Sequence, residues 1–480
     1  MDHPPSPTTV QTPPSSVRGN AKPLITALFP PTITTTSDEI EQSYTLTATN
    51  WNPDAAKFRG RYVSRLKQLH SLPKELRTLP EGFPEKVVTP LDWAGDELKQ
   101  EEWLVELGEG EKEEIRSAVG GLKPQGINCL RDIARENFPL PTLSVKLAAL
   151  ADKLYTGRGF FVLRGLDPDE FTEEENMMAY VGITSYLANQ RGKQDERGNY
   201  VLHLLDAGSA AAPDGVRQAP YSNVAQPFHT DTGDLVTLYV LQPALHGGHT
   251  LLASSTHLYN TLASLRKDLI QTLASPTWPY DTFSTPNTPA YHLRPLLTPP
   301  TTSPIPLLNF ARRPLIGSPV SPRTPGIPSL TSAQEDALDT LHYLSLGAAV
   351  RVRQRAGDLV VWNNLAVVHA REGFRDSDAS RQHERDEGQE QHEQQEDHVK
   401  KGEERKHGGG DDEGDKSGKK GKRHLVRLWL RDSTRGWEVP EVWAERWREV
   451  YGYAGEQRWP VRPVVDYEHV TTRVRSCGYA

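Results

Sequence analysis

A run of apolar and β-branched residues from Asp234 to Leu241 constrains the fold of this chain more than any other stretch. It is rich in residue types that favour strands and Pro243 closes it, so it predicts a buried β-strand. His229 and Asp231 stand just before it, two residues apart. Because alternate residues of extended backbone point to one face, this imidazole and carboxylate would face the same point. With a second histidine from another strand they would form a facial triad for ferrous iron.

The pair alone does not establish a metal site, because an Asp after a turn often only caps a loop. A second ligand candidate ends the segment Gly357 to His369, which reads as a strand, a polar turn and another short apolar run. A histidine at the end of a buried strand is more often a core residue than a ligand. The case for a metal therefore rests on His229, Asp231 and His369 together.

The other histidines are weaker candidates. Three crowd around a glycine pair without a carboxylate at usable spacing: His246, His249 and His257. Four more fall in a low-complexity segment, where a mobile chain would not hold a preorganised site: His383, His392, His398 and His407.

Composition excludes several classes of protein. The 480 residues predict two or three domains, or one large domain with extensions, and the net charge of −8 argues against a general nucleic-acid binder. Cys129 and Cys477 are the only cysteines, which indicates neither a disulfide framework nor a cysteine-based zinc site. No apolar stretch is long enough to span a membrane, and the first residues lack the features of a secretory signal. We therefore expect a cytoplasmic protein.

Changes in amino-acid composition divide the chain into a tail, an arm and a main domain. Residues 1–38 are rich in Pro, Ser and Thr and predict a disordered tail. Residues 39–124 predict a helical and extended arm that packs on the core, with Trp93 and Trp103 as its anchors. The main domain spans 125–470 and contains a charged, low-complexity insertion at 376–422, which we expect to be disordered.

Within the main domain, helical spacing alternates with short strand patterns. Four segments read as helices: Leu143 to Leu154, Asp169 to Leu187, Tyr259 to Ala274 and Ala333 to Leu346. Glycine-bracketed strands such as Phe160 to Arg164 lie between them, which favours an α+β chain built on a β-sandwich or barrel.

The proline-rich stretch 275–331 predicts a long excursion that serves as a lid, a binding loop or a linker. Arg294, Arg312 and Arg313 fall within it. They either meet an anionic substrate or form charge pairs at the surface.

The last strand pattern runs from Arg423 to Asp432. Alternation puts Arg423, Leu425 and Arg427 on one face, next to an apolar face. Two guanidinium groups on one strand face are either solvated or placed to bind a carboxylate in bidentate fashion.

Four motifs in this order resemble the TauD/TfdA family of Fe(II)- and 2-oxoglutarate-dependent dioxygenases over roughly residues 125–432. They are His229-x-Asp231, Gly247-Gly248-x-Thr250, Asn363-Asn364 with His369, and Arg423-x-x-x-Arg427. The resemblance implies a double-stranded β-helix, or jelly-roll, core with flanking helices. One departure is the insertion between His369 and Arg423, since the family usually has a short loop there.

The resemblance also implies roles for these residues. His229, Asp231 and His369 would hold Fe(II), and Thr250 and Arg423 would bind the distal carboxylate of 2-oxoglutarate. Arg427 would face an acidic group of the substrate or assist the binding of 2-oxoglutarate. The implied reaction uses O₂ to hydroxylate a small, anionic organic substrate, and it releases succinate and CO₂.

Two alternatives remain at this point. One is a catalytically silent jelly-roll protein that binds or regulates. The other is a zinc hydrolase that uses the same three ligands, although hydrolysis has no use for Thr250 paired with Arg423. The sequence does not identify the substrate or the oligomeric state.

Overall fold

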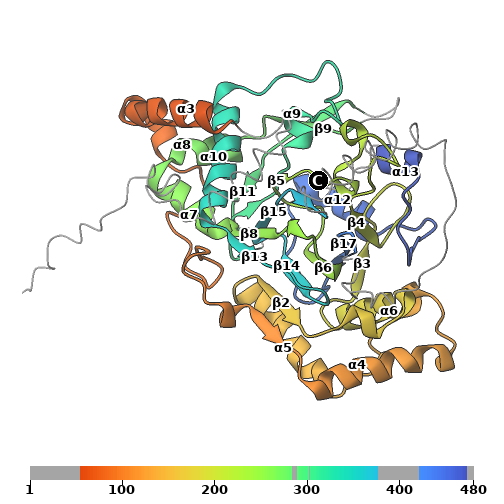
Figure 1. The fold of residues 1–480 in the computed structure, drawn as a ribbon. Helices are drawn as coiled ribbons and strands as arrows, with labels where there is room; N and C mark the ends of the chain where they lie inside the picture. Colours follow the sequence, from red (N-terminus) through yellow and green to blue (C-terminus); the bar gives the residue numbers. More distant parts are fainter. Residues whose placement is uncertain (1–53, 284–288, 302, 377–420, 473–480) are drawn as a thin grey trace, which may run out of the picture.

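The computed structural model describes residues 54–283, 289–301, 303–376 and 421–472. The predicted tail at 1–38 lies outside the described residues, as does residue range 377–420 of the predicted insertion. The described chain forms two principal β-sheets with helices around them (Figure 1). This mixture of sheets and helices confirms the α+β class.

The larger sheet has seven strands, and β6 and β17 lie at its centre. In spatial order the strands are β1 (Leu104–Glu106), β2 (Phe160–Arg164), β14 (Leu359–Asn363), β6 (Leu235–Gln242), β17 (His424–Arg431) and β3 (Gln190–Gly192), while β4 (Leu202–Leu205) also pairs with β17. The predicted strand after Asp234 is β6, and its first six residues are buried. Long apolar runs suit this position because both faces of the strand are covered.

The smaller sheet has four strands and carries both histidine candidates. In spatial order the strands are β13 (Val350–Val352), β8 (Thr250–Ser254), β15 (Val367–Arg371) and β5 (Gln226–His229). β15 runs antiparallel to both β5 and β8. The turn from β14 to β15 and the turn from β5 to β6 each connect the two sheets.

Three two-stranded ribbons complete the described strands: β9 (Trp278–Asp281) with β10 (Tyr291–Arg294), β11 (Leu297–Thr298) with β12 (Leu307–Leu308), and β7 (His246–Gly247) with β16 (Phe374–Arg375).

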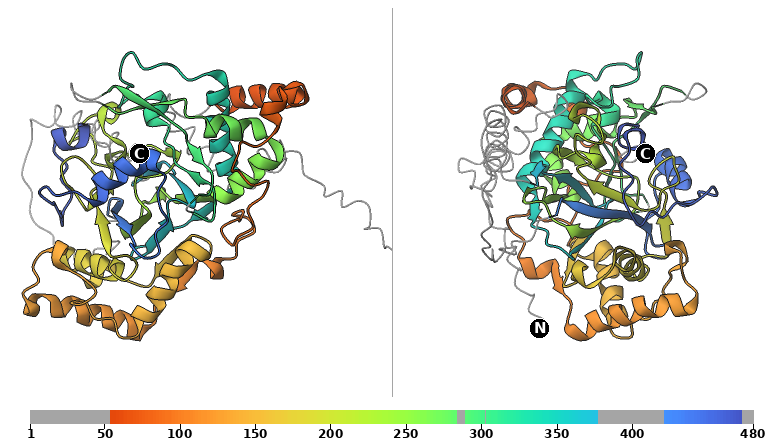
Figure 2. Two further views of the ribbon diagram at one scale, coloured as in Figure 1. Left: turned by 180° about the vertical axis from the view of Figure 1, so that it is seen from behind. Right: turned by 45° about the vertical axis from the view of Figure 1, so that its right-hand side comes forward.

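Some helices pack directly on the sheets and others pack on those helices. Their bounds are α3 (Ala55–Gln68), α4 (Glu109–Leu122), α5 (Leu143–Thr156), α6 (Glu173–Thr184), α7 (Ser255–Leu265), α8 (Lys267–Ala274), α9 (Arg313–Ile316), α10 (Ser332–Ala348), α12 (Glu441–Tyr451) and α13 (Tyr467–Thr471). The smaller sheet is covered by α7 and α10, while α5 packs on β2 and β14 of the larger sheet. The group α4, α5 and α6 stays together on one side of the molecule in every view (Figure 2).

The described part of the arm packs on the core, and it also contributes a strand. Trp93 and Trp103 both contact Phe160 of β2, with ring centroids 5.2 and 5.8 Å apart. Trp93 also donates its Nε1–H to the carbonyl of Arg158 at 2.8 Å. Strand β1 of the arm runs parallel to β2 and extends the larger sheet.

Two predictions from the sequence differ from the structure. The helix predicted from Tyr259 to Ala274 is two helices, because Arg266 leaves the helical conformation and pairs with Asp268 and Asp336. The stretch 275–331 is not one long loop, since it contains β9 to β12 and α9.

No helix within the described residues is long and apolar enough to cross a lipid bilayer.

Candidate metal centre

Three predicted ligands, His229, Asp231 and His369, converge in a buried group. His229 ends β5 and lies opposite His369 of β15, while Asp231 follows in the turn that leads to β6. The Nε2 atom of His229 lies 3.6 Å from Oδ1 of Asp231, and the Nε2 atom of His369 lies 4.0 Å from Oδ2. One ligand atom from each residue falls within 4.8 Å of the others, and the described part of the chain holds no second such group.

The protonation and burial of these groups fit a divalent cation. Burial, together with electrostatic repulsion from His229, holds the pKa of His369 well below its usual value, so the ring is neutral and can offer a lone pair. The Nδ1 atom of His229 lies 2.9 Å from the carbonyl of Pro227, which leaves Nε2 for a metal. The Oδ1 atom of Asp231 is buried and has no hydrogen-bond partner among the described residues. An unpaired buried carboxylate oxygen is costly, and a cation bound there would remove the cost.

Asn364 fixes the backbone that presents Asp231. Its Oδ1 atom accepts a hydrogen bond from the backbone N–H of Asp231 at 2.9 Å. Its Nδ2 group donates to the carbonyls of Asp231 and Gly233 at 2.7 and 2.8 Å. Since Asn364 belongs to the turn between β14 and β15, it also joins the Asp231 turn to the strand that carries His369.

The second carboxylate oxygen of Asp231 is held by two donors from β17. Arg427 donates from Nη1 to Oδ2 at 2.8 Å, and Trp429 donates from Nε1 to the same oxygen at 3.0 Å. Burial alone would raise the pKa of Asp231, but the charge of Arg427 and the contact with His229 hold it well below its usual value. Asp231 is therefore an anion, as a metal ligand must be.

A cavity lies beside this group, and its lining is strongly basic. It is lined by Leu204, Pro220, Gln226, His229, Leu238, Thr250, Trp362, His369, Ala370, Arg371, Arg423 and Arg427. Three of these described residues are arginines and none is an aspartate or glutamate. The electrostatic field of the cavity thus favours anions.

Arg423 is buried, and Asp376 is an anion whose charge acts on it. Its Nη2 group donates to the carbonyl of Gly248 at 3.3 Å, and its guanidinium lies 4.8 Å from the ring centroid of Phe374. Nη1 is buried with no hydrogen-bond partner in the described chain. Burial and the charge of Arg371 lower the pKa of Arg423 well below its usual value. A bound carboxylate would supply the missing partner.

Gly248 makes room for Arg423. Its φ is +70°, which disfavours L side chains, and a Cβ there would lie 3.0 Å from Nε of Arg423. The glycine at this position therefore permits the close approach of the Arg423 guanidinium.

Thr250 begins β8, which pairs with β15, the strand that carries His369. Cross-strand pairing sets Arg371 of β15 opposite Thr250 of β8 and Gln226 of β5, two residues beyond His369. The Oγ1 atom of Thr250 accepts a hydrogen bond from Gln354 Nε2 at 2.9 Å, so the hydroxyl can still donate. Thr250 and Arg423 both line the cavity.

The structure does not bring Arg294, Arg312 and Arg313 to this cavity. The guanidinium of Arg294 lies over the Tyr280 ring at 3.8 Å, and Arg312 pairs with Asp339 at 2.9 Å. Arg313 donates to Gln218 at 3.3 Å. Their role in substrate binding is thus not supported, and all three are buried rather than at the surface.

The remaining histidine candidates also lie elsewhere. His257 pairs with Asp92 at 3.2 Å, and neither His246 nor His249 belongs to the metal-ligand group. The four histidines of the insertion, His383, His392, His398 and His407, lie outside the described residues.

Sequence reasoning missed three residues of the site: Gln194, Arg371 and Trp429. Gln194 is buried and accepts a hydrogen bond from Nε of Arg427 at 2.7 Å. Trp429 could have been found, because the alternation that joins Arg423 to Arg427 places residue 429 on the same face. Nothing in the local sequence marks Gln194.

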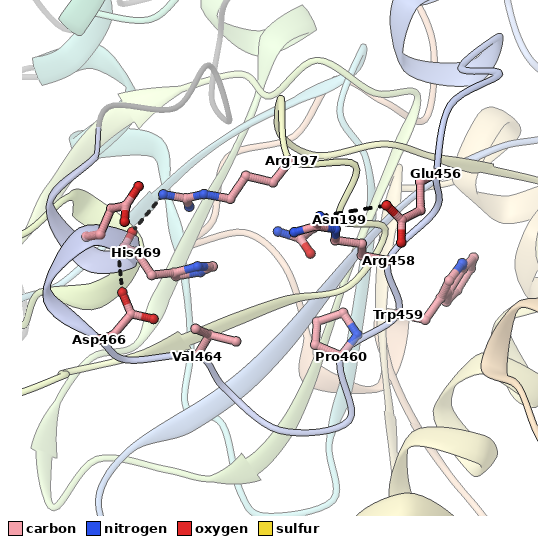
Figure 3. Close-up of a pocket in the computed structure, with 10 residues that line it drawn as sticks. Arg197, Asn199, Glu456, Arg458, Trp459, Pro460, Val464, Asp466 and His469 are labelled. Atoms are coloured by element: carbon pink, nitrogen blue, oxygen red, sulfur yellow. Dashed lines mark hydrogen bonds and ion pairs between the residues drawn. The ribbon is translucent and has the colours of Figure 1, made fainter.

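A larger pocket lies between the loop at 197–199 and the C-terminal segment 456–469 (Figure 3). Its charged side chains face groups of the same pocket: Arg458 lies 3.8 Å from Glu456, and Arg197 reaches the carbonyl of His469 at 3.4 Å. It contains none of the predicted site residues.

The family described as "Taurine catabolism dioxygenase TauD, TfdA family" matches residues 121–385. The matched range contains the three ligand candidates and Thr250, and it ends before Arg423.

Two curated relatives and one solved structure are similar to this chain. "Taurine hydroxylase-like protein SAT17" of Stachybotrys chartarum is 34% identical over 306 residues, 62% of this chain and 78% of the relative. "FR-33289 synthase" of Streptomyces rubellomurinus is 28% identical over 169 residues, 35% of this chain and 49% of the relative. An asparagine oxygenase solved with Fe(II), 2S,3S-3-hydroxyasparagine and succinate has a TM-score of 0.47 and 17% identity, and the likeness covers 68% of this chain and 93% of that one.

Proposed function

Because this chain belongs to the TauD/TfdA family and is an iron- and 2-oxoglutarate-dependent dioxygenase, we propose that it hydroxylates a small, anionic organic substrate at the cavity beside His229, Asp231 and His369. The observation that carries the proposal is the convergence of these three buried side chains, with ligand atoms within 4.8 Å of one another. Two imidazoles and one carboxylate are the ligand set of non-haem iron oxygenases.

We assign the iron to His229, Asp231 and His369. Bound there, Fe(II) would supply the redox chemistry that couples oxidative decarboxylation of 2-oxoglutarate to hydroxylation of a C–H bond. The chain fixes the geometry: β5 and β15 orient the two rings, and Asn364 anchors the backbone of Asp231. The surrounding strands keep all three side chains at least nine-tenths buried, which limits access of bulk water to the reacting atoms.

Thr250 and Arg423 are the proposed partners of the distal carboxylate of 2-oxoglutarate. Both line the cavity, and Nη1 of Arg423 has no hydrogen-bond partner in the described chain. A guanidinium and a hydroxyl together can hold a carboxylate in one orientation. Succinate keeps this same carboxylate, so these two residues would hold the co-product as well.

The charge of the cavity supports an anionic substrate. Arg371 and Arg423 line the cavity, no lining residue is an aspartate or glutamate, and Arg427 already pairs with Asp231, so the lining favours organic anions. The relative from Stachybotrys is named taurine hydroxylase-like, and taurine carries a sulfonate, which is a small organic anion. Both points favour an organic acid.

The proposal extends to the architecture. The two sheets form the double-stranded β-helix of the family, within a domain at 125–470. Residues 54–124 of the arm at 39–124 pack on it, the tail at 1–38 precedes the arm in sequence, and the insertion at 376–422 interrupts the domain in sequence.

Anaerobic titration with Fe(II) and 2-oxoglutarate tests the proposal. The complex should show a weak visible charge-transfer band that is lost in His229→Ala and kept in His257→Ala, which changes a histidine outside the site. A screen of candidate sulfonic, carboxylic and phosphonic acids for stimulated succinate release then identifies the substrate class. A wild-type protein without the band would instead be the catalytically silent binder.

A further inference from the structure

The carboxylate of Asp231 has two oxygens in very different surroundings. Oδ2 accepts hydrogen bonds from Arg427 Nη1 at 2.8 Å and from Trp429 Nε1 at 3.0 Å. Oδ1 is buried with no hydrogen-bond partner in the described chain. Each carboxylate oxygen offers about two lone-pair directions. Those of Oδ2 are therefore occupied by protein, whereas those of Oδ1 are available.

Trp429 is built into this position by its strand and by a glycine. It stands two residues after Arg427 in β17, so both side chains leave the strand on the same face. The indole is fully buried. A Cβ at residue 233, two residues after Asp231, would lie only 3.1 Å from the Trp429 ring. Gly233 thus allows the indole to approach the turn that presents Asp231.

From this geometry we propose that Trp429 is a positioning residue that, with Arg427, restricts Asp231 to binding iron through Oδ1 alone. The inference rests on the proposed iron site. Its consequence is an open coordination position. Two imidazoles and a monodentate carboxylate leave three positions of an octahedral ion, which the 2-oxo acid chelate and O₂ need. A carboxylate that rotated to bind through both oxygens would occupy one of them.

The N–H group of the indole is the part of Trp429 that matters, so Trp429→Phe is the informative variant. It keeps a large aromatic side chain and removes the donor to Oδ2. Affinity for Co(II), a redox-stable probe of the iron site, should fall about 10- to 100-fold, as is typical when an outer partner of a metal ligand is lost. The visible band of the anaerobic Fe(II) complex with 2-oxoglutarate should also weaken or move.

Trp447→Phe is the matched control. Trp447 is buried and donates its Nε1–H to the carboxylate of Asp234 at 2.6 Å, three residues from the proposed ligand. Loss of this bond removes an indole–carboxylate contact of the same kind without touching Asp231. The control should keep Co(II) affinity and the band. Equal affinities in wild type and Trp429→Phe, or an equal loss in both variants, would overturn the proposal.

A measurement on folded protein covers the case in which Trp429→Phe does not fold. With ¹⁵N-labelled indoles, the N–H groups of Trp429 and Trp447 should both resonate downfield because each donates to a carboxylate, and Trp447→Phe removes one of them. The remaining resonance should shift when Zn(II) binds. If the chemical shift of this resonance did not change when Zn(II) bound at the site, the proposed role of Trp429 would be contradicted. If wild type binds no Co(II) or Zn(II) at all, the proposed function fails first.

Discussion

Asn364→Ala gives the sharpest test of how the fold presents Asp231. The amide side chain makes three hydrogen bonds, one accepted from the backbone N–H of Asp231 and two donated to the carbonyls of Asp231 and Gly233. All of these groups are buried. At about 1 kcal/mol of net stability for each bond, the loss is about 3 kcal/mol. Because the three backbone partners would remain buried and unpaired, the cost should rise toward about 5 kcal/mol.

Asn363→Ala separates stability from metal binding. Asn363 is the adjacent buried amide, and it donates to the carbonyl of Leu154 at 3.1 Å and accepts from the N–H of Leu365 at 3.0 Å. Two bonds predict a loss of about 2 kcal/mol in the free energy of unfolding. Since neither bond touches the Asp231 turn, this variant should keep the metal affinity of wild type.

The assay combines denaturant unfolding of the metal-free proteins with anaerobic Co(II) titration. Asn364→Ala should be the less stable variant and should bind Co(II) about 10- to 100-fold more weakly than wild type. The reasoning is refuted if Asn364→Ala unfolds at the wild-type denaturant concentration. It is also refuted if both variants lose the same metal affinity, because the effect would then come from general destabilisation.

Three further outcomes follow from the geometry. Arg423→Met should raise the KM for 2-oxoglutarate about 10- to 100-fold through loss of a charge-assisted contact, and steady-state succinate release checks this. Metal at about 100 times its Kd should stabilise the fold by about 2.7 kcal/mol, seen as a rise in Tm that chelation reverses and His369→Ala abolishes. Burial lowers the pKa of His342 to about 3, below its value in the unfolded chain. Because the folded state then binds fewer protons than the unfolded state, the free energy of unfolding should fall as pH drops below about 6.5. Denaturant unfolding from about pH 7 to about pH 5 should show this dependence in wild type and a weaker one in His342→Gln.

Local periodicity was sufficient to find the metal-ligand candidates. A His-x-Asp pair before a strong strand pattern, and a histidine closing another, required only that extended backbone alternates its side chains. The structure confirms the strand from Asp234 as β6 and brings His229, Asp231 and His369 together. The same alternation places Trp429 on the strand face of Arg427, but its indole N–H was not recognised as a donor to the site.

Contacts between segments that are distant in sequence determine the features that local sequence patterns did not predict. Arg266 interrupts a regular helical pattern because Asp336, seventy residues away in α10, helps to bind it. The short strand β9 contains Pro279, and a proline argues against a strand when only the sequence is considered. Because β9 pairs with β10 alone, it tolerates the missing N–H. Arg294 and Arg312 looked free to meet a substrate only because Tyr280 and Asp339 could not be placed beside them.

Side chains of β17 and of Arg423, the residue before it, serve three carboxylates: that of the proposed 2-oxoglutarate and those of Asp231 and Asp234. The odd-numbered face presents Arg423 to the proposed 2-oxoglutarate site, Arg427 and Trp429 to Asp231, and Arg431 to Asp234 at 2.7 Å. Because β17 pairs with β6 along most of its length, a shift of one residue in register would turn this face away from all three at once. Lys422 and Arg423, which follow Gly421, must therefore lead into β17 in one register. We infer that the proposed binding of the oxo acid at Arg423 and the proposed binding of iron at Asp231 would both stabilise this alignment of β17.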